Sequence, residues 1–194
     1  MMIGNDKMGK IVFVTGGARS GKSRFAEKYA QAAGNKLAYI ATAEILDEEM
    51  ADRVKQHQAR RSENWQTFEA PFAAEQILKR VADFPVVLFD CLTVYTANLL
   101  LREQSADIET RRSRVLDQAQ KVLEAAKATS SIVIFVSNEV GMGIVPDNAL
   151  AREYRDLAGW INQMFATDAD EVYLVISGLA VELKKLAVSA PEHK

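Results

Sequence analysis

The residues best suited to chemistry lie in an eight-residue run near the start of the chain. Residues 16–23 read Gly-Gly-Ala-Arg-Ser-Gly-Lys-Ser and match the phosphate-loop pattern G-x-x-x-x-G-K-[ST]. Glycines let such a loop curl so that successive backbone N–H groups point at phosphate oxygens. Lys22 would reach the terminal phosphates, and the Ser23 hydroxyl would bind a Mg²⁺ ion that bridges them. Because a strand pattern precedes the run and a helix pattern follows it, nucleotide binding is favoured over a chance match.

A carboxylate follows an apolar run further along the chain. Residues 86–89 read Val-Val-Leu-Phe and end at Asp90. In phosphate-loop proteins an acid at the end of such a strand faces the nucleotide, and it can hold Mg²⁺ together with the loop hydroxyl. The alternative is a buried strand that ends in Asp at an ordinary turn. With the phosphate loop upstream, the functional interpretation is favoured. The adjacent Cys91 is expected to be a small buried side chain without a catalytic function.

A basic stretch carries one of the two histidines of the chain. Arg53 and Arg61 each lie four residues from His57, so a helix would place all three on one face. The neighbouring cations would disfavour the protonated imidazolium and leave a neutral nitrogen able to act as a nucleophile. Composition alone favours the alternative, a solvated basic face whose histidine has no function. His193 lies near the C-terminus and is expected to be inert.

A glycine-rich stretch after another apolar run is a further candidate. Residues 138–146 read Asn-Glu-Val-Gly-Met-Gly-Ile-Val-Pro and follow an apolar run at 132–136. Flexible residues beside a polar pair are typical of a site loop at the carboxyl edge of a sheet. A plain connecting loop is an equally good interpretation from physics alone.

Short apolar runs alternate with helical patterns along the whole chain, which predicts an α/β protein with a phosphate-loop nucleotide-binding fold. The sheet should be mainly parallel, with helices on both faces. Strands are expected over 10–15, 37–41, 65–69, 86–89, 132–136 and 172–176. Helices are expected over 22–33, 47–61, 72–82, 93–104, 109–127, 148–165 and 179–187. We expect one domain over 10–187, with a flexible tail at 1–9 and a frayed end at 188–194.

Composition excludes several classes of protein. The 194 residues carry a net charge of −2, one cysteine and two histidines. An internal disulfide is impossible, and a zinc site built from Cys and His is disfavoured. The net charge gives no general attraction for nucleic acid, and no aromatic and basic stripe suggests one. Without a secretion signal or an apolar run long enough to span a membrane, we expect a cytoplasmic protein.

The motifs together resemble the bifunctional adenosylcobinamide kinase / adenosylcobinamide-phosphate guanylyltransferase family of cobalamin biosynthesis. The phosphate loop, Tyr-Ile-Ala-Thr-Ala at 39–43 and the long motif at 138–146 carry the resemblance. It continues through 150–152, 156–159, 162–163 and 170–172, so that it covers about residues 10–185. The phosphate loop is generic, whereas the motif at 138–146 is far more specific.

The resemblance implies a set of functional residues. His57 takes the place of the histidine that attacks the α-phosphate of GTP and becomes guanylylated. The implied nucleotide contacts are Gly16, Gly17, Ala18, Arg19, Ser20, Gly21, Lys22, Ser23, Thr42, Ala43, Glu44, Gln58, Ala59, Arg60, Arg61, Glu69 and Asp90. This chain departs from the family with Gln56 where a second histidine is frequent, and with Asp90 where Glu is common. Residues 58–61 also differ from the sequence that is usual in the family at this place. Among these four residues, only Arg61 matches the family directly.

The implied substrates are ATP or GTP with Mg²⁺, together with adenosylcobinamide and its phosphate. Phosphoryl transfer to the aminopropanol hydroxyl would come first, and guanylyl transfer through histidine would follow. The resemblance also implies a homotrimer. Two alternatives remain at this point: a phosphate-loop kinase for another small metabolite without guanylyltransferase activity, and a nucleotide-binding regulatory module.

Overall fold

The computed structural model describes residues 9–44 and 64–188. Residues 1–8 of the tail predicted at 1–9, the predicted helix at 47–61 and the end of the chain from 189 lie outside these residues. The strands are β1 (Lys10–Gly16), β2 (Leu37–Ala41), β3 (Trp65–Glu69), β4 (Val86–Asp90), β5 (Ile132–Asn138), β6 (Glu171–Ile176) and β7 (Leu179–Glu182). The helices are α1 (Lys22–Ala33), α3 (Ala74–Arg80), α4 (Leu92–Arg102), α5 (Ile108–Lys127) and α6 (Ala149–Asp168), followed by a 3₁₀ turn, η1 (Leu183–Lys185).

All seven strands form one sheet in the order β3-β2-β4-β5-β1-β6-β7. The first six strands are parallel, and β7 runs antiparallel to β6. The predicted α/β class with a mainly parallel sheet is therefore confirmed. The strand that carries the phosphate loop and the strand that ends in Asp90 are not neighbours, because β5 lies between them.

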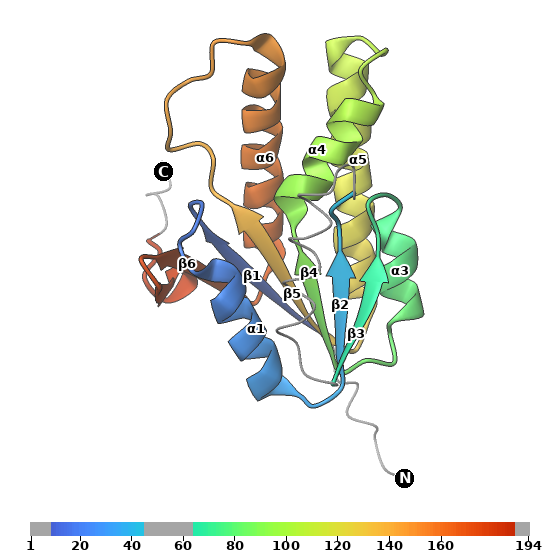
Figure 1. Cartoon of the computed structure of the whole chain (residues 1–194), viewed down its shortest axis with the longest axis vertical. Helices are drawn as coiled ribbons and strands as arrows, with labels where there is room; N and C mark the ends of the chain where they lie inside the picture. The colour runs from blue at the N-terminus through green and yellow to red at the C-terminus, as the bar shows by residue number, and fades with distance from the viewer. Residues whose placement is uncertain (1–8, 45–63, 189–194) are drawn as a thin grey trace, which may run out of the picture.

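The helices cover both faces of the sheet, as predicted. Helix α1 packs on one face, where Ala26 and Ala30 join the apolar side chains of Val14, Leu88 and other strand residues. Helices α3, α4, α5 and α6 pack on the opposite face, which holds the larger core. Figure 1 shows α1 in blue in front of the sheet and the other four helices behind and above it. We call these two sides the α1 face and the opposite face. Among the helices of the described residues, none is both long and apolar enough to cross a membrane.

The predicted helix over 179–187 is wrong. Ser177 and Gly178 both have positive φ, 52° and 82°, and join β6 to β7 as a hairpin. Two consecutive positive φ values are the mark of the tight turn whose twist matches that of a hairpin. The dipeptide Ser-Gly between two apolar runs was the sequence signal for this turn. Only the three residues of η1 are helical in this stretch.

Hydrogen bonds to Glu171 fasten β6 to the start of β1 and to α1. Its carboxylate accepts from Lys10 at 2.5 Å, from Tyr29 at 2.7 Å and from Tyr173 at 2.9 Å. Burial alone would raise the pKa of Glu171, but these hydrogen bonds outweigh it and lower the pKa. Because the native pKa is depressed, ionised Glu171 stabilises the fold above its unfolded pKa, and this contribution disappears as the pH falls through the native pKa.

We therefore expect Glu171→Gln to lower the free energy of unfolding by about 1–2 kcal/mol at pH 7. Urea unfolding across a pH series should show this difference shrinking below about pH 4, near the ordinary pKa of Glu. Glu124→Gln is the matched control, since Glu124 is an exposed acid whose contacts with Gln120 at 2.5 Å and Lys127 at 3.7 Å lie at the surface. An equal loss at pH 3 and pH 7 would contradict a role for the charge.

Candidate functional site

The phosphate loop begins where β1 ends, and its backbone needs glycine at two positions. A Cβ on Gly16 would lie 2.3 Å from the carbonyl oxygen of Val175, and its φ is 156°. Gly21 has φ 96° and precedes the first residue of α1. Side chains other than glycine are strained at such angles. The loop therefore reaches the N-terminus of α1 in a conformation that depends on the two glycines of its motif.

Backbone hydrogen bonds hold this loop from two sides. The N–H of Glu139, just after β5, donates to the carbonyl oxygen of Gly16 at 3.1 Å. The N–H of Gly178, in the β6–β7 turn, donates to the carbonyl oxygen of Ser20 at 2.8 Å. Within the loop, the N–H of Ser20 donates to Gly17 at 3.2 Å. These bonds preorganise the loop, so that little ordering would be needed when an anion binds.

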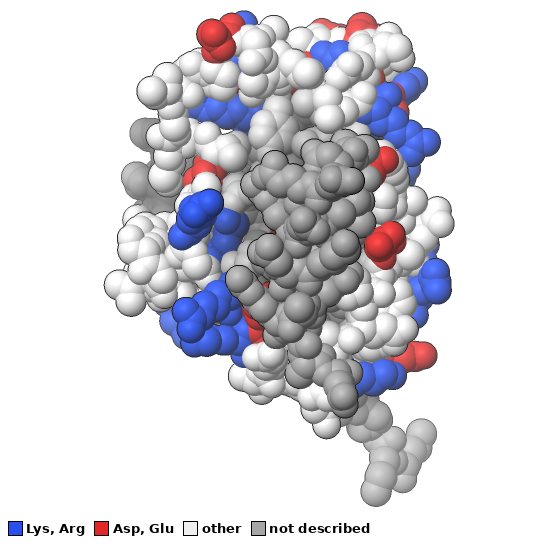
Figure 2. Space-filling view, viewed as in Figure 1, with Lys and Arg blue, Asp and Glu red and all other residues white. Residues whose placement is uncertain are grey.

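Lys22 lies across the mouth of the loop. Its Nζ donates to the carbonyl oxygen of Gly17 at 3.2 Å, and the residue is only 9% exposed. Burial lowers the pKa of Lys22, while the negative charge of Asp90 opposes that shift. Figure 2 shows Lys and Arg side chains gathered over α1, which also carries Arg24 and Lys28. A cation desolvated at this place is well suited to bind phosphate oxygens.

Asp90 ends β4 with its side chain on the α1 face. The hydroxyl of Tyr39 on β2 donates to Asp90 Oδ2 at 3.0 Å. Glu69 ends β3 in the same rung of the sheet, because both acids pair with Ala41 in the register of β2. Since neighbouring strands lie about 4.8 Å apart, the two acidic residues are roughly 10 Å apart along the carboxyl edge.

The oxygen donors at this edge fit a hard divalent cation. The hydroxyl of Ser23 and the carboxylate of Asp90 are ligand types that Mg²⁺ prefers. Over residues 9–44 and 64–188, no group of three or more His, Cys, Asp or Glu side chains could hold a metal without other ligands. Phosphate oxygens and water would therefore have to complete the coordination, as in other nucleotide sites.

Thr42 is fully buried and is bonded to the chain just beyond Asp90. Its hydroxyl accepts from the N–H of Cys91 at 2.8 Å and donates to the carbonyl oxygen of Cys91 at 2.9 Å. The side chain of Asn98 on α4 donates to the carbonyl oxygen of Thr42 at 2.8 Å. The hydroxyl of Thr42 thus fastens β2 to β4. The adjoining Ala43 and Glu44 are half-buried at the same edge.

Two further predictions concern Cys91 and the stretch around His57. Burial raises the pKa of Cys91 to about 11, so its thiol stays protonated and unreactive near neutral pH. His57 and the four predicted contacts at 58–61 lie outside the described residues. The structure brings residues 16–23, Thr42, Asp90 and Glu69 to one edge of the sheet.

Three polar side chains that support this edge were not predicted. Thr93, Asn98 and Asn162 hydrogen-bond to backbone groups at the ends of β2 and β5. All three belong to helices on the opposite face, and each acts on a strand distant in sequence. A local sequence pattern carries no signal of such contacts.

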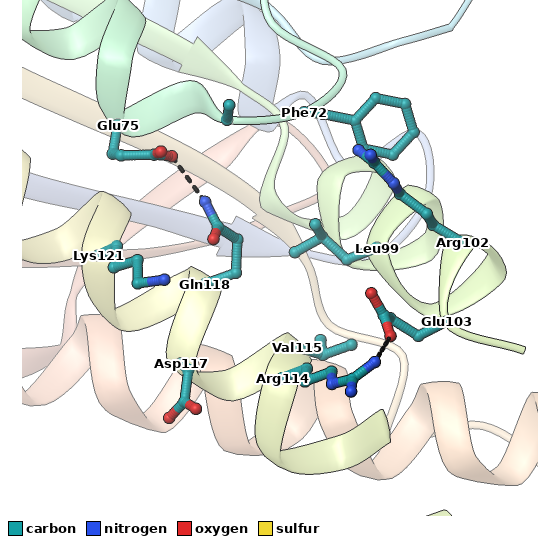
Figure 3. Close-up of a pocket in the computed structure, with 11 residues that line it drawn as sticks. Phe72, Glu75, Leu99, Arg102, Glu103, Arg114, Val115, Asp117, Gln118 and Lys121 are labelled. Carbon is teal, nitrogen blue, oxygen red and sulfur yellow. Dashed lines mark hydrogen bonds and ion pairs between the residues drawn. The ribbon is translucent and has the colours of Figure 1, made fainter. Parts of the chain in front are cut away.

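A separate cavity of about 360 Å³ lies among α3, α4 and α5, away from the phosphate loop. Figure 3 shows two pairs of its polar side chains facing each other, Glu103 with Arg114 and Glu75 with Gln118. Glu103 pairs with Arg114 at 2.7 Å, and Glu75 accepts from Gln118 at 2.6 Å. Because these groups satisfy one another and none is a predicted site residue, the phosphate-loop edge is the candidate active site.

Comparison with known proteins finds relatives over nearly the whole chain. A family model described as cobinamide kinase / cobinamide phosphate guanyltransferase matches residues 12–183. The bifunctional adenosylcobalamin biosynthesis protein CobU of Salmonella typhimurium is 41% identical over 181 residues, covering 90% of this chain and 99% of that protein. CobU of Escherichia coli is 40% identical over the same shares of both chains. CobP of Pseudomonas aeruginosa is 40% identical over 88% of this chain and 95% of that protein.

Proposed function

The chain belongs to the cobinamide kinase / cobinamide phosphate guanyltransferase family, and we propose that it carries out both reactions on adenosylcobinamide. It phosphorylates adenosylcobinamide with ATP or GTP, and it then transfers GMP from GTP to the resulting phosphate. The observation that carries the proposal is the preorganised phosphate loop, with Lys22 across its mouth and Asp90 on the same face of the sheet.

In the first reaction, the aminopropanol hydroxyl oxygen bonds to the γ-phosphorus of the nucleotide. The bond from that phosphorus to the β–γ bridging oxygen breaks, its electron pair leaves with the nucleoside diphosphate, and the hydroxyl proton passes to water. Lys22 and the backbone amides of residues 17–23 stabilise charge on the transferred group and on the leaving oxygen. Ser23 and Asp90 would hold Mg²⁺, which supplies further neutralisation of phosphate charge when bound.

In the second reaction, His57 is the nucleophile. Its neutral imidazole nitrogen attacks the α-phosphorus of GTP, and pyrophosphate leaves with the electron pair of the broken bond. A phosphate oxygen of adenosylcobinamide phosphate then attacks the guanylyl group, the phosphorus–nitrogen bond breaks, and adenosylcobinamide-GDP forms. The covalent intermediate divides one difficult displacement into two easier ones. The resemblance to the family supports this role of His57. The same resemblance supports Glu44, Glu69 and Arg61 as nucleotide contacts.

Two labels in one experiment test the proposal. Incubation of the chain with adenosylcobinamide and GTP labelled at the γ-phosphorus should give labelled adenosylcobinamide phosphate. With GTP labelled at the α-phosphorus, the label should appear in adenosylcobinamide-GDP in an amount equal to the pyrophosphate released. Transfer of the γ-label without transfer of the α-label would show that the chain is a kinase without guanylyltransferase activity. Failure of both transfers would contradict the proposal.

We also propose that the protein is a cytoplasmic homotrimer. The resemblance to the family supports the trimer, and so do the apolar side chains of Met142 and Ile144, which are 84% and 96% exposed. A partner chain would remove this apolar surface from water. Light scattering should give three times the 21.5 kDa mass of the chain, and a monomer at micromolar concentration would contradict the trimer.

A further inference from the structure

The end of β5 places a polar side chain between the phosphate loop and Asp90. In the sheet order, β5 lies between β1 and β4, so its last residue reaches the carboxyl edge between the two halves of the site. That residue is Asn138, which pairs with Gly16 in the register of β1. Asp90 pairs with Val136, two residues earlier on β5. Asn138 therefore lies two residues further than Asp90 in the strand direction, beyond the carboxyl end of β4.

Asn138 lies on the same face of the sheet as the phosphate-loop helix. Side chains alternate along a strand, and Ile134 and Val136 pack on the α1 face. Asn138 is two residues after Val136, so its side chain lies on the α1 face as well. Asp90 lies on that face for the same reason, because it is two residues after Leu88 on β4. By contrast, Ser137 points to the opposite face, where its hydroxyl donates to Asn162 at 2.6 Å.

The backbone of Asn138 is held on every side. Its N–H donates to the hydroxyl of Thr93 at 2.7 Å, and its carbonyl oxygen accepts from Asn162 at 3.1 Å. The next N–H, from Glu139, donates to Gly16. Thr93 on α4 and Asn162 on α6 therefore fix the position of Asn138 relative to the phosphate loop. Functional side chains need such support to hold a precise orientation.

The side chain of Asn138, however, has a buried oxygen that is unsatisfied. Asn138 Oδ1 is buried in the structure and accepts no hydrogen bond there. Ser20 Oγ is unsatisfied as well, and it lies 2.8 Å from where a Cβ on Gly16 would be. Native proteins rarely leave buried polar atoms unpaired, and such atoms frequently belong to a binding or catalytic site. The amide oxygen of Asn138 therefore has the capacity to accept one hydrogen bond from a ligand.

We propose that Asn138 orients the attacking hydroxyl in the phosphoryl-transfer reaction. Its Oδ1 accepts the hydrogen bond of the hydroxyl group and holds the oxygen toward the γ-phosphorus. The oxygen–phosphorus bond forms as the bond to the nucleoside diphosphate breaks, and the proton then leaves to water. Asn138 acts on orientation and keeps its own protons throughout. This inference rests on the proposed kinase activity for its substrate, but water in place of the hydroxyl would use the same contact.

The test compares Asn138→Ala with the unchanged chain in five measurements. The kcat for phosphorylation of adenosylcobinamide should fall about 30- to 100-fold, the order expected when a reacting group loses its alignment. Slow GTP hydrolysis without adenosylcobinamide should fall by a similar factor. The Kd of a non-hydrolysable GTP analogue and the rate of guanylyl transfer to preformed adenosylcobinamide phosphate should each change less than about threefold. We expect Tm to stay the same or rise, because an unsatisfied buried oxygen is removed.

Ser137→Ala is the matched control, one residue earlier and on the opposite face. It should lower Tm while leaving kcat for phosphorylation within about threefold of the unchanged chain at a permissive temperature. Unchanged phosphorylation and hydrolysis in Asn138→Ala would overturn the inference, and so would an equal loss of every activity with a fall in Tm. Absence of adenosylcobinamide phosphorylation in the unchanged chain, with hydrolysis that depends on Asn138, would overturn the proposed substrate and support the inference.

Discussion

Replacing Lys22 by methionine should lower kcat for phosphoryl transfer by about 10²- to 10³-fold. Methionine has nearly the length of lysine and fills the same space, but it cannot neutralise charge that develops on the γ-phosphoryl group and the β–γ bridging oxygen. Nucleotide affinity should fall by a smaller factor, because the backbone amides of the loop remain. Transfer of γ-labelled phosphate to adenosylcobinamide measures the rate, and titration with a fluorescent GTP analogue measures the affinity.

The same change should not destabilise the free protein. Burial lowers the pKa of Lys22, which means that the fold disfavours its charged form. Methionine removes that penalty, and the lost hydrogen bond to Gly17 is a single long one at 3.2 Å. We therefore expect Tm without nucleotide to be equal to that of the unchanged chain or higher. Lys28→Met, an exposed change on the same helix, should leave both Tm and kcat near their original values. A Lys22→Met protein that retains full phosphoryl transfer would contradict the role of this side chain.

The part of the site that sequence reasoning found is the part that is local in sequence. A phosphate loop needs glycines, lysine and a hydroxyl within eight residues, so its pattern can be recognised in the sequence without knowledge of the fold. The apolar run before Asp90 is equally local, as are the strand runs that gave the α/β class. The parallel arrangement then brings Asp90 and Glu69 to the phosphate-loop edge, because the carboxyl ends of parallel strands share one edge.

The part that sequence reasoning missed depends on contacts across the fold. Whether β5 or β4 lies beside β1 cannot be derived from the order of elements along the chain, yet this placement puts Asn138 beside Gly16. The resemblance names Thr42 as a nucleotide contact, and it carries no signal that the Thr42 hydroxyl also bonds the backbone of Cys91. The helix expected over 179–187 failed for a different reason. Apolar periodicity in so short a segment does not separate helix from strand, and the Ser-Gly turn should have decided it.

Exposure of the chain to GTP labelled at the α-phosphorus should give a covalent guanylyl adduct that is acid-labile and base-stable, and His57→Ala should abolish it. A phosphorus–nitrogen bond to imidazole has that stability pattern, which distinguishes it from a serine or carboxylate ester. Guanylyl transfer to adenosylcobinamide phosphate should fall at least about 10³-fold, because no other group supplies the nucleophile. Phosphorylation of adenosylcobinamide, which depends on the phosphate loop, should remain within a fewfold of the original rate.

The small number of histidines makes this test unusually sharp. The chain has only two, so His193→Ala is the single matched control, and it should form the adduct as the unchanged chain does. Loss of the adduct in His193→Ala, or its persistence in His57→Ala, would assign the nucleophile elsewhere. An adduct in neither variant nor the unchanged chain, with adenosylcobinamide-GDP still produced, would mean that the phosphate of the substrate attacks GTP directly. In that case His57 would be a surface residue on a basic helix, which is the interpretation that composition alone favours.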